Sequence, residues 1–171
     1  MWFAIGTFVL FLGWFFFNGG STYTLYGGKI LNSAKVITNT ILSGCMSCGT
    51  VFLFKKPIHL FFSKCFQVEG QYYKTFRSSQ RNDVASCCNG LLAGLVAVTA
   101  PCDAIEPWAA VCIGIIAGLL YSCFSKLLLT LNIDDPLEAA SVHYINGIWG
   151  CLSCFIFDST RGFVSGSPLM G

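Results

Sequence analysis

The sequence is 171 residues long, with 54% hydrophobic residues, 11% charged residues and a formal net charge of +2. Soluble domains carry about 25% charged residues, so this composition excludes an ordinary soluble domain. The small net charge gives no reason to expect a nucleic-acid partner. We therefore expect an integral membrane protein whose solvent is the lipid bilayer.

Five apolar stretches follow one another along the chain, and a helix needs about 20 such residues to cross a bilayer. They lie at residues 2–17, 34–54, 84–100, 108–131 and 136–157. The pattern predicts an all-α membrane protein, a single domain over residues 1–171 built as a bundle of about five transmembrane helices. The first stretch begins almost at Met1, without the basic leader of a secretory signal. We therefore expect a truncated chain or a fragment.

The segment 55–83 carries six of the ten lysine and arginine residues. Basic loops stay on the cytosolic side, so this segment, the N-terminus and residues 132–135 are expected there. The expected external loops are 18–33, 100–107 and the tail after Asp158. Three basic residues oppose this orientation: Lys29, Lys35 and Arg161. The segment either contacts anionic headgroups or is a solvated linker, and its lack of an amphipathic period favours the linker.

Two pairs of glycines have the spacing that lets membrane helices approach closely. They are Gly90 with Gly94 and Gly114 with Gly118. We expect tight helix packing at both pairs, which says nothing about chemistry.

The ten cysteines do not form a metal or disulfide pattern. The two CxxC pairs are Cys45 with Cys48 and Cys151 with Cys154, and both lie inside apolar stretches. A zinc site needs four converging ligands, whereas a buried free cysteine packs as a small hydrophobic residue. We therefore expect no metal and no cofactor.

The stretch DDPLEAASVHYINGIWG, residues 134–150, places a histidine inside an apolar run. Asp135 suits a helix N-cap, Pro136 the first helical position, and Glu138 the acidic position of a capping box. An α-helix would place six residues on one face: Ala139, His143, Asn146, Gly147, Gly150 and Cys154. Because ionisable groups inside a membrane are costly, His143 is a functional candidate.

Three segments resemble the ammonium transporter (Amt/Rh) superfamily: GWFFFNGGS at 13–21, CNGLLAGLVAVTAPCDAIEPWAA at 88–110, and residues 134–150. They occur in family order, and the chain is similar to the second of the family's two inverted five-helix repeats. The resemblance implies a multi-pass protein of the plasma membrane and a homotrimer when full length. It implies ammonium or ammonia as the transported species.

The resemblance also implies roles for three residues of the first stretch. Ser21 matches a serine that holds ammonium at the external vestibule, Phe17 a phenylalanine that gates the pore entrance, and Trp14 a tryptophan that lines the pore. Taken alone, Trp14 and Phe17 also fit membrane-interface aromatics, and Ser21 fits a turn cap.

Near the other end of the path, His143 matches the second histidine of the family's twin-histidine pair. Asp135 and Glu138 match acidic positions at the cytoplasmic side. A lone buried histidine is usually a packing residue, but its place in the motif favours a pore role for His143. Helix capping explains Asp135 without a role in transport.

Two hypotheses follow. In the first, the chain belongs to a transporter that recruits ammonium at an external site and passes ammonia along a histidine-lined apolar pore. In the second, it is a half-protein that does not transport: a fragment, a sensor or an interaction subunit. An enzyme is not expected, because no nucleophile–base pair or phosphate-binding loop is present.

Overall fold

The computed structural model describes residues 2–22, 30–65, 84–160 and 162–165, and all regular structure in these ranges is helical. The elements are α1 (Trp2–Gly20), α2 (Ile30–Cys65), α4 (Val84–Thr99), α5 (Pro107–Thr130), the π-helical turn η2 (Ala140–Tyr144), α6 (Ile145–Phe157) and the 3₁₀ turn η3 (Phe163–Ser165). The prediction of an all-α fold is confirmed.

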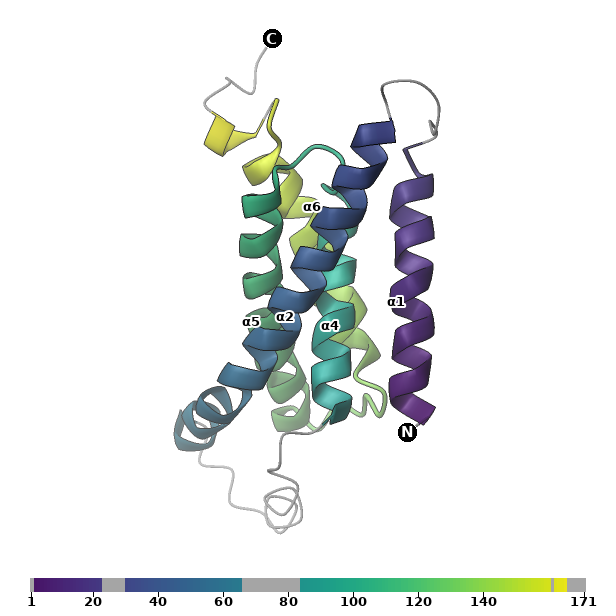
Figure 1. The fold of residues 1–171 in the computed structure, drawn as a ribbon. Helices are drawn as coiled ribbons and strands as arrows, with labels where there is room; N and C mark the ends of the chain where they lie inside the picture. Colours follow the sequence, from purple (N-terminus) through teal and green to yellow (C-terminus); the bar gives the residue numbers. More distant parts are fainter. Residues whose placement is uncertain (1, 23–29, 66–83, 161, 166–171) are drawn as a thin grey trace.

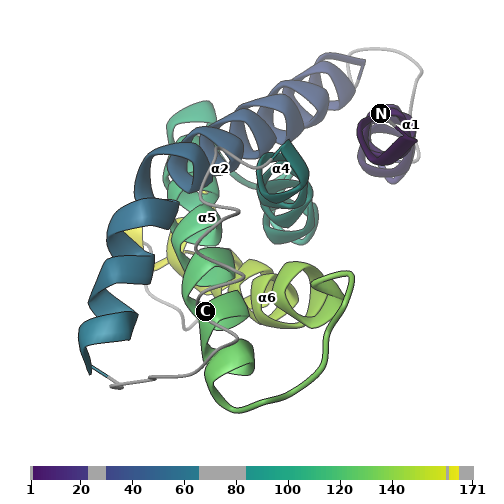
Figure 2. The same ribbon diagram turned by 90° about the horizontal axis from the view of Figure 1, so that it is seen from below.

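Four stretches are long and apolar enough to span a membrane: Trp2–Gly20, Ile30–Phe54, Pro107–Thr130 and Ala140–Phe157. The helix α4 is apolar but has only 16 residues. It contacts α1, α2, α5 and α6, so protein covers most of it (Figure 2). A short helix in this position does not have to match the bilayer alone.

Figure 1 shows the helices side by side, with consecutive helices running in opposite directions. One end of the bundle, here called the Asp135 end, holds the start of α1, the end of α2 and the turn before η2. The other, the Ser21 end, holds the end of α1, the start of α2 and the end of α6. This alternation agrees with the expected order of loops, and the side that faces the cytosol stays a prediction.

The glycine pairs bring α4 and α5 into backbone contact with α2. A Cβ atom added at Gly94 or Gly114 would lie 2.5 Å or 2.3 Å from the backbone oxygen of Ser43. One added at Gly118 would lie 2.7 Å from the backbone oxygen of Ser47. Only glycine fits at these positions, which explains the spacing seen in the sequence.

Hydrogen bonds reinforce the contact between α2 and α4. The Ser43 hydroxyl donates to the Gly94 carbonyl at 2.8 Å, and the Ser47 hydroxyl donates to the Gly90 carbonyl at 2.6 Å. Both serines are fully buried. Buried hydroxyls need partners, and the close helix approach supplies them.

The helix α2 continues to Cys65, so the prediction that a loop begins at Lys55 is wrong. Apolar residues continue beyond the expected helix end, in the sequence PIHLFF at 57–62. Figures 1 and 2 show that the last turns of α2 swing away from the bundle. Pro57 lies in this stretch, and proline bends helices because it lacks the N–H donor. The rest of the expected loop, 66–83, lies outside the described residues.

We predict that Gly114→Ala lowers the free energy of unfolding by about 1–3 kcal/mol, the usual range for overpacking, because the new methyl group meets backbone rather than a movable side chain. Gly13→Ala is the control, since nothing lies within 4 Å of a Cβ atom there. Thermal unfolding in detergent measures both variants. Equal melting temperatures for the two would contradict the packing described here.

Candidate functional site

Asp135 lies just before the last membrane helix and caps its first turn. Its carboxylate accepts hydrogen bonds from three backbone N–H groups, those of Ala139, Ala140 and Ser141, at 2.9, 2.9 and 3.4 Å. A turn closed by the Glu138 N–H and the Asp135 carbonyl, at 2.9 Å, separates the cap from the helix. The helix therefore begins after Glu138, and the expected start at Pro136 is wrong.

Glu138 does not occupy the capping-box position that the sequence suggested. Its φ is 54°, in the left-handed region that non-glycine residues rarely adopt, and this conformation directs the side chain into the bundle. Asn89 Nδ2 donates to Glu138 Oε2 at 2.9 Å, and Ser125 Oγ donates to Oε1 at 2.7 Å. The Tyr121 hydroxyl also donates to Oε2. These donors come from two helices, α4 and α5, and meet at one carboxylate.

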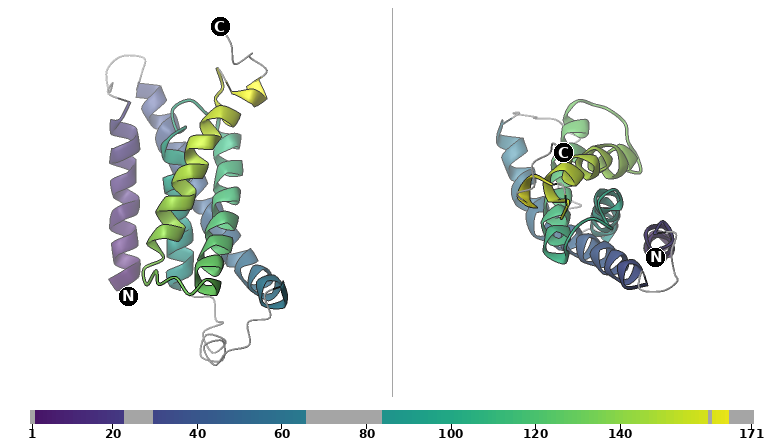
Figure 3. Two further views of the ribbon diagram at one scale, coloured as in Figure 1. Left: turned by 180° about the vertical axis from the view of Figure 1, so that it is seen from behind. Right: turned by 90° about the horizontal axis from the view of Figure 1, so that it is seen from above.

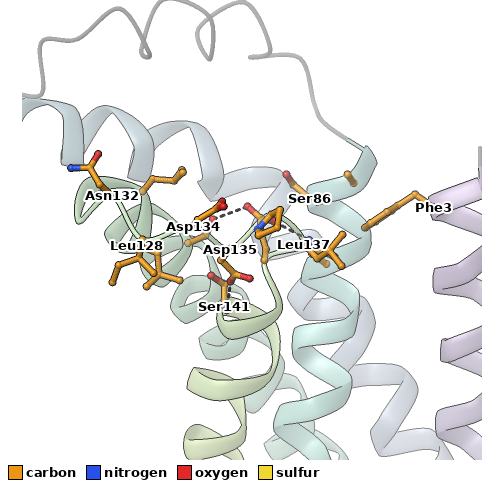
Figure 4. Close-up of a pocket in the computed structure, with 15 residues that line it drawn as sticks. Phe3, Ser86, Leu128, Asn132, Asp134, Asp135, Leu137 and Ser141 are labelled. Carbon is orange, nitrogen blue, oxygen red and sulfur yellow. Dashed lines mark hydrogen bonds between the residues drawn. The ribbon is translucent and has the colours of Figure 1, made fainter.

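A pocket of about 560 Å³ opens beside these groups at the Asp135 end (Figure 4). Three carboxylates line it, those of Asp134, Asp135 and Glu138, and its described lining contains no lysine or arginine. Ser141 lines it as well, and its fully buried hydroxyl has no hydrogen-bond partner among the described residues. The described lining of the pocket is therefore acidic.

His143 lies on the π-helical turn η2, and its side chain is exposed. The bond from the Ile145 N–H to the Ala140 carbonyl spans five residues, which defines the π register. Asn146 donates from Nδ2 to the Ser141 carbonyl at 3.0 Å. Turns of this kind occur mostly as single insertions in α-helices, often at functional sites.

The π register divides the face that an unbroken α-helix would have formed. Asn146 is fully buried, and a Cβ atom added at Gly150 would lie 2.7 Å from the Ala97 carbonyl oxygen in α4. His143 is exposed, and a Cβ atom at Gly147 would meet nothing within 4 Å. The expectation that all six residues share one face is therefore wrong. The extra residue in the turn separates His143 from the face packed on α4.

The three candidate residues of α1 lie near the Ser21 end. Trp14 is half-buried and donates from Nε1 to the Thr99 hydroxyl of α4 at 2.9 Å. The ring of Phe17 is 61% exposed, with its centroid 6.5 Å from that of Trp14. The Ser21 hydroxyl donates to the Phe17 carbonyl at 2.6 Å and keeps its oxygen exposed to other donors. Trp14 is thus fixed, whereas Phe17 and Ser21 remain accessible.

These candidates belong to two separate helices that flank α4. Among the described residues, no Cα atom of α1 lies within 8 Å of one in η2 or α6 (Figure 3). The backbone positions of Trp14 and Phe17 are therefore apart from that of His143, whereas Asp135 and Glu138 directly precede η2. Large apolar side chains are exposed on both helices, including Phe8 and Phe16 in α1 and Leu152 and Phe155 in α6. These exposed apolar side chains need lipid or further protein to cover them.

Sequence reasoning missed the partners of Glu138. Asn89, Tyr121 and Ser125 stand in apolar helices, where each resembles an ordinary packing residue or an interface aromatic. A polar side chain in each of two neighbouring apolar helices was a usable signal, because such groups need partners inside a membrane. That Glu138 is the acidic partner of these side chains could be recognised only from the conformation of the turn at Glu138.

No group of three or more histidine, cysteine, aspartate or glutamate side chains in the described part of the chain is arranged to hold a metal ion. Every cysteine whose side chain is described is a free thiol. Cys102 lies in the connection at the Ser21 end, and burial raises its pKa to about 11, which keeps the thiol protonated.

The long apolar helices define a multi-pass helical membrane protein, and the side chains around Glu138 place polar groups inside its bundle. The sequence model of the Ammonium Transporter Family matches residues 1–60 and 72–168. The chain belongs to this family. It is 36% identical over 156 residues to putative ammonium transporter 1 of Caenorhabditis elegans, covering 91% of this chain and 26% of that protein.

Other relatives agree with this family. Ammonium transporter Amt2 of Archaeoglobus fulgidus is 34% identical, with 98% of this chain and 31% of that protein covered. A solved structure described as a sensor Amt protein has a TM-score of 0.69 at 33% identity and covers 91% of this chain and 33% of that one. Saccharomyces cerevisiae Mep2 has a TM-score of 0.70 at 27% identity, with 91% and 30% covered. The chain thus spans about a third of the length of these relatives.

We predict that Asp135→Ala lowers the free energy of unfolding by about 0.5–2 kcal/mol, the usual cost of losing an N-cap, because three backbone N–H groups lose their acceptor. Asp134→Ala is the matched control, since Asp134 is exposed and the bonds to the helix start go to its neighbour Asp135. Thermal unfolding in detergent compares the two variants. A larger loss for Asp134→Ala would refute the capping role.

Proposed function

We propose that this chain supplies one half of an ammonium-transport path. The Ser21 end recruits ammonium from outside, and ammonia then passes along the face that carries His143 toward the Asp135 end. The observation that carries this proposal is the exposed His143 on a π-helical turn within a membrane-spanning stretch, in a chain that belongs to the ammonium transporter family.

The positive charge of ammonium makes its passage through an apolar conduit costly. Charged side chains cost about 2.5–3.5 kcal/mol at the centre of a membrane helix on insertion scales, so a bare cation enters an apolar conduit with difficulty. Desolvation lowers the pKa of an amine and favours loss of its proton. Neutral ammonia then crosses the apolar section, and an imidazole can accept or donate hydrogen bonds along the way. Electroneutral and proton-coupled versions both satisfy this argument.

The two ends suit their proposed tasks. At the Ser21 end, the exposed Phe17 ring attracts a cation through its π face, and the Ser21 oxygen accepts a hydrogen bond. At the Asp135 end, the carboxylate-lined pocket attracts ammonium once it has regained its proton. The apolar side chains exposed on α1 and α6 support a conduit that is completed by more protein, such as the rest of a full-length, trimeric transporter.

A second candidate is a half-protein that binds or senses ammonium without transporting it. Two observations favour it: the chain spans about a quarter to a third of the length of its relatives, and one structural relative is described as a sensor. Among the described residues, no Cα atom of α1 lies within 8 Å of one in η2.

Uptake of ammonium or methylammonium by cells that lack their own ammonium transporters tests the proposal. We predict no uptake with the 171 residues alone, uptake when they are joined to a complementary first repeat from a relative, and at least a tenfold loss with His143→Ala in that joined protein. The control is Tyr144→Phe, which keeps the ring next to His143 and removes only a hydroxyl. Full uptake by the His143→Ala protein would contradict a pore role, and no uptake by the joined protein would favour the sensor.

A further inference from the structure

We propose that Glu138 is a positioning residue for His143: its side chain fastens the turn that precedes η2 to two other helices and so sets where the imidazole stands. The proposal rests on the pore role of His143 given above. It gives a structural reason for the orientation of His143, and this reason could not be inferred from the sequence.

The Glu138 carboxylate is hydrogen-bonded to side chains of two other helices. Asn89 of α4 and Ser125 of α5 donate to different oxygens, at 2.9 and 2.7 Å, and Tyr121 of α5 adds a third bond. Tyr121 is 1% exposed, so its hydroxyl has no water to turn to. The charged acceptor strengthens each of these bonds. We call this set of four side chains the Glu138 clamp.

The backbone links the Glu138 clamp to His143. The Glu138 carbonyl accepts the Val142 N–H at 2.9 Å, and Val142 directly precedes His143. The Val142 side chain is 2% exposed and packs in the same buried cluster as Tyr121. The clamp therefore fixes Val142 on the inside, and His143, the next residue, is held on the exposed side of the turn.

The backbone conformation of Glu138 is itself unusual. A non-glycine residue with φ of 54° has a costly backbone conformation, which persists only where its surroundings enforce it. The three donors to its side chain supply that enforcement. If the carboxylate lost them, the turn would be free to relax into an ordinary helical start. The π register of η2 and the position of His143 would change with it.

Nuclear magnetic resonance of ¹⁵N-histidine in the 171-residue chain, held in detergent or nanodiscs, tests this directly and does not depend on transport. The sequence has two histidines, so His59→Gln leaves the His143 imidazole as the one labelled ring. We expect a single set of His143 signals in this background. Glu138→Gln and the milder Tyr121→Phe should shift those signals, or split them into several sets.

Asn39→Ala is the matched control, because Asn39 donates two buried bonds at the Ser21 end, to the carbonyls of Cys102 and Ile105 at 3.0 Å each. It should lower the melting temperature and leave the His143 signals in place. The proposal is overturned if the Tyr121→Phe chain melts lower but keeps unchanged His143 signals, or if the background chain already gives several sets. A chain that passes this test but shows no role for His143 in uptake would refute the proposed function alone.

Discussion

The close approach of α2 to α4 and α5 is the contact on which the rest of this structure depends. Inside a bilayer, helices gain little from burying apolar surface against one another, so association requires close packing and hydrogen bonds. Gly94 and Gly114 both meet the backbone of Ser43 from different helices, and the Ser43 and Ser47 hydroxyls bond to α4. These contacts place α4 and α5 at fixed positions, and α6 then packs against both.

That arrangement creates the polar region at the Asp135 end. Because α4 and α5 are held together, Asn89 and Tyr121 converge on one carboxylate from separate helices. The Glu138 carboxylate accepts hydrogen bonds from both side chains, and Glu138 adopts a left-handed backbone conformation to reach them. The π-helical turn that carries His143 begins two residues later, at Ala140. The histidine thus sits on an element whose start is tied to the bundle by Asp135 and Glu138. The helix α1 packs on α4 and α2, with no Cα atom within 8 Å of one in α6.

The fold class, the five helices and the glycine contacts could be predicted from the sequence, because apolar length and GxxxG spacing are local properties. The capping by Asp135 was also readable, since Asp-Asp-Pro before an apolar run is a helix-start pattern. The inward turn of Glu138 was not, because it depends on donors about 13–49 residues away in the chain. The π register of η2 likewise broke the regular spacing from which the face of His143 was inferred. The bond from Trp14 to Thr99 joins helices whose adjacency is set by packing, not by pattern.

The central claim is that His143 borders a passage for a polar solute rather than lipid. Paramagnetic relaxation of the ¹⁵N signals of His143, measured in nanodiscs with spin-labelled acyl chains on the protein joined to a complementary first repeat, tests this most directly. The account predicts little effect of the labelled lipid. Strong broadening by the acyl-chain label would place the imidazole against lipid and contradict the account.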